Sequence, residues 1–124
     1  MKIRTGFVSN SSSSSFICVG FKVSDPKECL KKIIEEIGGA DKEKLLETLY
    51  RDGIYEVGEM LRKMIKGFYI PYMERGGNII GIGQSCHEGE IGMIDLDAIA
   101  GSVEEVSRII GMGKAKVYFG EIWS

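Results

Sequence analysis

The four residues Asp25-Pro26-Lys27-Glu28 separate two stretches of different periodicity. Before them, residues 16–23 are almost entirely apolar, which is typical of a buried β-strand. Asp25 is expected to cap a helix, because Pro26 suits the first helical position and Glu28 completes a capping box. After them, apolar residues recur at helical spacing, at Leu30, Ile33, Ile34 and Ile37. A strand followed by a capped helix indicates a fold that packs helices on a sheet.

The rest of the chain continues this mixture of periods. Helical stripes are predicted in residues 41–53, 54–66 and 96–110, and strands in residues 1–8, 68–73, 78–84, 90–94 and 114–123. Pro71 cannot donate a ladder hydrogen bond, so its strand is expected at an edge or with a bulge. In the last strand, Val117, Phe119 and Ile122 are expected in the core. The order predicts an α/β (α+β) fold over residues 1–124, a single domain with about four helices on a mixed, largely antiparallel sheet.

Composition narrows the classes of partner. The chain has 124 residues, a length that suits one domain, and a net charge of −2, which is unlike the basic footprint of a nucleic-acid binder. Its three cysteines show no framework spacing, so reduced thiols in a cytoplasm are expected. No apolar stretch approaches the roughly 18 residues that span a bilayer. Neither nucleic acid nor a membrane is therefore an expected partner.

The segment Gly81-Ile82-Gly83-Gln84-Ser85-Cys86 begins like a dinucleotide-binding fingerprint. Cys86 stands where the third glycine belongs, and the segment lies within a predicted strand instead of at a strand-to-helix turn. We therefore expect no standard nucleotide-binding motif here. The alternative is that Gly81 and Gly83 allow close packing or a bulge.

The only histidine, His87, follows Cys86 in a predicted polar loop over residues 85–89. A thiolate beside a base suggests a nucleophile, so a small hydrolase or transferase using Cys86 and His87 is one alternative. Neighbouring side chains of an extended chain point to opposite faces, however, and zinc would require four ligands. We expect no metal and no other cofactor. Tyr69 and Tyr72 are expected either to line a groove or to pack at the rim of the core.

Five consecutive serines, Ser11–Ser15, lie between two apolar segments. In a loop, such a tract presents hydroxyls and free backbone amides, which can form an anion-binding nest to which Arg4 adds charge. A flexible segment or a recognition tag are the alternatives. The predicted ligand-binding residues are Arg4, Ser9, Asn10, Ser11, Ser12, Ser13, Ser14, Ser15, Gly81 and Gly83.

Residues 1–17, MKIRTGFVSNSSSSSFI, resemble an N-terminal signature of many uncharacterised bacteriophage and prophage proteins. That signature has a basic-rich start, Gly-Phe-Val, Ser/Thr-Asn, five serines and Phe-Ile/Val. Residues 117–121 are similar to the terminal strand of some of these proteins. The resemblance implies a phage-encoded protein in the host bacterial cytoplasm, and it implies no activity, cofactor or catalytic residue.

These observations predict a non-enzymatic phage accessory protein, because the chain is small, shows no convergent catalytic groups and begins with residues that resemble the phage signature. It would be a binding module, alone or as a homo-oligomer, that acts on a host protein or on a small anionic, nucleotide-type host metabolite. Counter-defence against such a signal is one version of this hypothesis. A virion-associated structural protein that carries an N-terminal tag is a further alternative.

Overall fold

The structure, a computed structural model, describes residues 14–72, 78–87 and 95–122. The predicted strands at 1–8 and 90–94 lie outside these residues. The elements in chain order are β2 (Ser14–Lys22), α1 (Pro26–Ile37), the 3₁₀ helix η2 (Gly39–Asp41), α2 (Lys42–Asp52), α3 (Ile54–Leu61), β3 (Phe68–Tyr69), β4 (Ile79–His87), α4 (Leu96–Ile110) and β5 (Lys116–Ile122). They confirm the predicted α+β fold.

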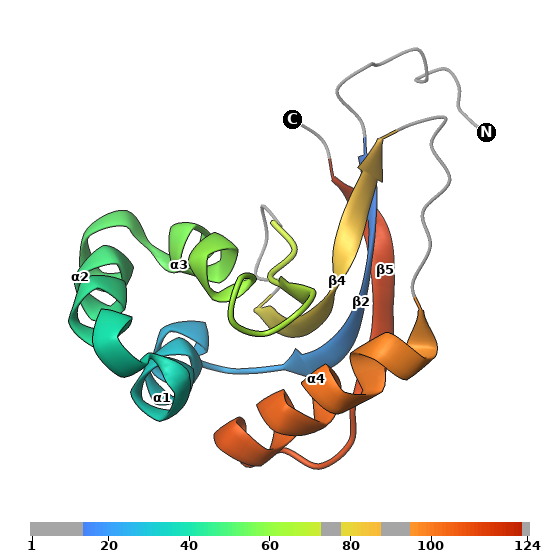
Figure 1. Ribbon diagram of the computed structural model, residues 1–124. Helices are drawn as coiled ribbons and strands as arrows, with labels where there is room; N and C mark the ends of the chain where they lie inside the picture. Colours follow the sequence, from blue (N-terminus) through green and yellow to red (C-terminus); the bar gives the residue numbers. More distant parts are fainter. Residues whose placement is uncertain (1–13, 73–77, 88–94, 123–124) are drawn as a thin grey trace.

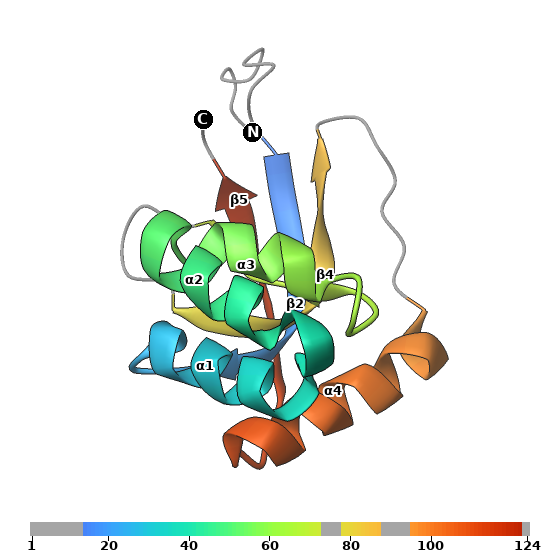
Figure 2. The same ribbon diagram turned by 60° about the vertical axis from the view of Figure 1, so that its left-hand side comes forward.

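The four described strands form one sheet in the order β3-β4-β2-β5, and every described pairing is antiparallel. The helices α1, α2 and α3 group on one side of this sheet (Figures 1 and 2). Near the start of β5, α4 lies beside α1 (Figure 1). The first half of β2 and the last halves of β4 and β5 extend beyond the helices (Figures 1 and 2). The sheet is therefore longer than the layer that covers it.

Local sequence signals account for the helix boundaries. The Asp25 carboxylate accepts a hydrogen bond from the Glu28 N–H at 3.1 Å, as the capping pattern predicts. Asp41 stands at the N-cap of α2 but makes no side-chain capping bond. The third helix was predicted to reach Lys66, but α3 ends at Leu61, and turns lead from there into β3. Gly67, with φ of 81°, supplies the left-handed residue before that strand.

The two faces of the sheet carry separate apolar clusters. The larger cluster lies under the helices, where Phe21, Ile80 and Ile82 of the sheet meet Leu30 and Ile33 of α1. The smaller cluster lies on the other face and comprises Phe16, Cys18 and Ile79, with Tyr69 and Tyr118 packed against it. Alternation along β2 explains why neighbouring residues belong to different clusters. Where the helices cover them, the central strands are buried on both faces, at Phe21, Ile80 and Ile82 towards the helices and at Cys18 and Ile79 on the other face.

Several sequence predictions about the uncovered end of the sheet are wrong. Val117 and Phe119 were expected in the core but are 56% and 79% exposed, because no described helix packs closely on the side of β5 that carries them. The side chain of Ile122 lies outside the description. The predicted loop over residues 85–89 is wrong for its first part, since β4 continues through His87. Leu96, which was expected on the apolar stripe of the helix over residues 96–110, is also exposed, because the first turn of α4 extends away from the other helices (Figure 2).

Within the described residues, every helix is too short or too polar to cross a bilayer.

Candidate functional site

Most of the serine run lies outside the described residues, together with Arg4, Ser9 and Asn10. Of the run, the structure describes only the backbone of Ser14 and the whole of Ser15. Both residues belong to β2, so the prediction that they form part of a loop is wrong. The ligand-binding role of the run stays a prediction.

Gly81 and Gly83 lie buried in β4, between β2 and β3. The Gly83 N–H donates to the Gly67 carbonyl oxygen at 2.9 Å, and the Gly83 carbonyl accepts from Arg62 Nη1 at 3.2 Å. A Cβ on Gly81 would lie 2.6 Å from the Cα of Gly20. The close approach that the sequence suggested as an alternative is therefore confirmed. A ligand-binding role for these two glycines stays a prediction.

Cys86 and His87 are the last two residues of β4. Cys86 is half-buried and free. In the described part of the chain, no three His, Cys, Asp or Glu side chains gather as metal ligands. The side chain of His87 lies outside the described residues, so the enzymatic alternative that uses Cys86 and His87 stays a prediction.

A groove of about 460 Å³ lies between α3 and the β3 edge of the sheet. One wall is the face of α3 that carries Tyr55, Glu56 and Glu59. The other wall and the floor come from β3, the residues that follow it, and β4; they comprise Phe68, Tyr69, Ile70, Tyr72 and Ser85. Gly58 brings the walls together, since a Cβ there would lie 3.1 Å from Cδ1 of Ile70. Segments distant in sequence thus form one site.

Three tyrosines give the groove aromatic surfaces. The rings of Tyr55 and Tyr72 lie 5.3 Å apart at 56°, a tilted arrangement that aromatic pairs favour. Tyr69 is half-buried, and its hydroxyl shares a hydrogen bond with the Ser85 hydroxyl. Burial raises the pKa of Tyr69, and the hydrogen bond to Ser85 opposes this shift. At neutral pH, Tyr69 therefore presents a neutral, oriented ring and hydroxyl.

Two carboxylates make the groove acidic. Glu56 and Glu59 are exposed, and neither forms an ion pair within the described part of the chain. Arg62 does not line the groove, since its Nη1 donates to the carbonyl oxygens of Phe68 at 3.0 Å and Gly83 at 3.2 Å, but its charge is near enough to Tyr69 to lower the pKa of that group. A cation entering the groove would meet two carboxylates that pair with no described residue, together with aromatic faces, and both attract positive charge.

The sheet has an open edge beside this groove. β3 pairs with β4 only at Ile82 and Gly81. Beyond that point β4 continues through Ser85 to His87, where no described strand lies on its outer side. An exposed strand edge can accept an extended chain as an additional strand. The groove and this edge meet at Ser85, so one ligand could contact both.

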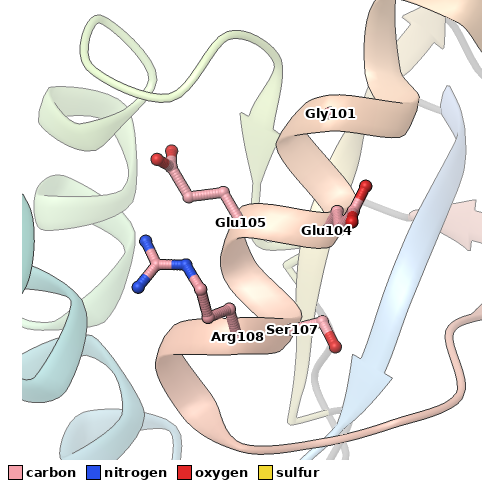
Figure 3. A pocket seen from close by; sticks show the side chains of 5 residues that line it. All are labelled: Gly101, Glu104, Glu105, Ser107 and Arg108. Carbon is pink, nitrogen blue, oxygen red and sulfur yellow. The ribbon is translucent and has the colours of Figure 1, made fainter.

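A second hollow, of about 470 Å³, lies on α4 and is lined by Gly101, Glu104, Glu105, Ser107 and Arg108. Figure 3 shows Glu105 and Arg108 pointing to one side of the helix, and Glu104 and Ser107 to the other. Arg108 pairs with Glu36 of α1 at 3.5 Å. Because all its lining residues come from one helix, this hollow is a weaker candidate than the groove.

The residues that make the groove were only partly visible in the sequence. Tyr69 and Tyr72 were expected either in a groove or at the core rim, and both line the groove. Tyr55, Glu56 and Glu59 were missed, although helical spacing puts them on one face of α3. No family model, curated protein or solved structure matched the chain when it was compared with known proteins.

Proposed function

We propose that the protein is a non-enzymatic binding module that recognises an extended, basic segment of a partner protein in the groove beside α3. The observation that carries this proposal is the combination of the carboxylates of Glu56 and Glu59, which pair with no described residue, with the tyrosine rings of the same groove. A lysine or arginine head would gain cation–π contact and charge pairing there.

The open edge of β4 favours a peptide over a small cation. An extended segment beside Ser85–His87 would continue the sheet past the short β3. Backbone hydrogen bonds would supply affinity, and alternate side chains would reach the groove and supply specificity. This mode matches a ligand with basic residues at alternate positions.

The resemblance of residues 1–17 to phage and prophage proteins makes a host protein the partner in this proposal. Counter-defence then consists of occupying a basic segment that the host protein needs. The version with a small anionic metabolite depends on the serine run, and the acidic groove does not favour it. That version stays a prediction.

Calorimetry with two matched peptides tests the proposal. The acetylated and amidated peptide Thr-Arg-Val-Arg-Thr is expected to bind, and Thr-Glu-Val-Glu-Thr is not. The double variant Glu56→Gln/Glu59→Gln is expected to weaken binding about tenfold, since each partly exposed pair contributes about 0.5–1 kcal/mol. The control Glu104→Gln/Glu105→Gln removes the same charge from α4 and should bind as the wild type does. If both double variants weakened peptide binding equally, the effect would come from net charge alone, and this result would contradict the proposal.

A further inference from the structure

The outer edge of β5 carries two exposed apolar side chains, Val117 and Phe119. The β2–β5 register places Phe119 opposite Ile17 and Val117 opposite Val19. β5 is the last strand of the sheet, so its outer side pairs with no strand in the described part of the chain. An exposed apolar edge strand is a template for pairing with another chain.

We infer that two copies of the chain join along β5, antiparallel, about a two-fold axis at Tyr118. With Tyr118 opposite its own copy, Val117 of each subunit lies opposite the partner's Phe119. One row of side chains then runs from Ile17 through Phe119 to the partner's Val117 and the partner's Val19. The two-fold axis generates a second, identical row of side chains, and pairing of the two β5 strands joins the two sheets into one continuous sheet.

The register follows from the pattern of side chains on β5. A shift by one residue would bring apolar side chains opposite residues of the other face. A shift by two would place either Val117 opposite Glu121 or Phe119 opposite Ala115. Of these registers, only the one centred on Tyr118 pairs both apolar side chains with large apolar partners.

Charge favours the antiparallel direction. Lys114 and Lys116 precede or begin β5, and Glu121 lies near its end. None of the three forms an ion pair within the described part of the chain. Antiparallel pairing brings the basic end of one strand beside the acidic end of the other, whereas parallel pairing would align like charges.

Sedimentation equilibrium of the full chain tests the association. The wild type is expected to sediment as a dimer, and Phe119→Lys as a monomer with an unchanged circular dichroism spectrum. Leu96→Lys, which places the same charge on an equally exposed site of α4, should remain a dimer. A wild type that is monomeric at every soluble concentration would overturn the inference. So would Phe119→Lys remaining a dimer.

Cross-linking tests the register independently of any effect of Phe119→Lys on folding. In a background with Cys29→Ser and Cys86→Ser, a mixture of Val117→Cys and Phe119→Cys chains should form disulfide-linked dimers under mild oxidation. Either variant alone should cross-link several-fold less. Equal cross-linking in all three samples would contradict the register. β3, beside the groove, and β5 lie at opposite edges of the sheet. The test of the dimer is therefore independent of the test of peptide binding.

Discussion

Gly83 and Cys18 face each other across the β2–β4 pair, where a Cβ added to Gly83 would lie 2.8 Å from the Cα of Cys18. It would lie closer still to the carbonyl oxygen of Ile17. Backbone on both strands would have to move to admit a methyl group. The two central strands therefore depend on glycine at this position.

The variant Gly83→Ala is expected to lower the free energy of unfolding by about 3 kcal/mol, the upper range for overpacking a buried site. Urea denaturation measures this change. Gly101→Ala is the matched control, because nothing lies within 4 Å of its added Cβ in α4. Alanine should stabilise that exposed helical position by about 0.5–1 kcal/mol. A Gly83→Ala protein as stable as the wild type would contradict the close approach.

Arg62 ties the end of α3 to both β3 and β4 through the carbonyl oxygens of Phe68 and Gly83. Arg62→Met would leave both part-buried carbonyls without this donor, so we expect a loss of about 2 kcal/mol in the free energy of unfolding. Thermal and urea unfolding measure it. Arg51→Met is the control, since Arg51 pairs with Glu47 and Asp52 on the surface of α2 and its loss should change little. Equal effects of the two substitutions would show that the Arg62 bridge does not stabilise the fold.

Burial raises the pKa of the Cys18 thiol to about 12. An unfolded thiol titrates near pH 8.5, so the unfolded state loses this proton first as the pH rises. The folded state should therefore lose stability from about pH 8.5 towards pH 12, by up to about 1.4 kcal/mol per pH unit. Below that window, Cys18 contributes no pH dependence.

Urea unfolding of wild type and Cys18→Ala at about pH 7.5 and about pH 10.5 isolates this contribution. Burial also raises the pKa of Cys29, which remains in the variant and cancels in the comparison. The pKa of Tyr69 is raised mainly by burial and in smaller part by the nearby Cys18, so removing Cys18 also lowers the pKa of Tyr69 and reduces the loss of stability further. Cys18→Ala should be less stable at the lower pH and should lose less stability between the two. Parallel pH dependences would show that the Cys18 thiol titrates normally.

Local patterns predicted most of the fold. The Asp25 cap and the apolar stripe of α1 depend only on residues within a few positions of each other, and both are present as predicted. The residues of β5 were placed in a strand correctly, but Val117 and Phe119 were wrongly assigned to the core. Alternation identifies the side chains that share a face. Whether a helix covers that face depends on the packing of distant elements.

The groove was harder to predict for the same reason. Periodicity alone puts Tyr55, Glu56 and Glu59 on one face of α3, but it cannot say which segment lies beside that face. The short β3 decides this, because it begins only at Phe68, opposite Ile82, and leaves β4 beyond Gly83 without a described strand on this side. The serine run was the main ligand site predicted from the sequence, and it lies largely outside the described residues.

Nuclear magnetic resonance tests most directly whether the groove beside α3 binds a basic peptide. In ¹H–¹⁵N spectra of the full chain titrated with the peptide Thr-Arg-Val-Arg-Thr, the amide signals of residues 55–59, 69–70, 72 and 85–87 are expected to shift together and to saturate. The amides of α4 around Glu104 and Glu105 should stay in place. Shifts confined to α4 or spread over all acidic surfaces, or no shifts with the protein folded, would contradict the account.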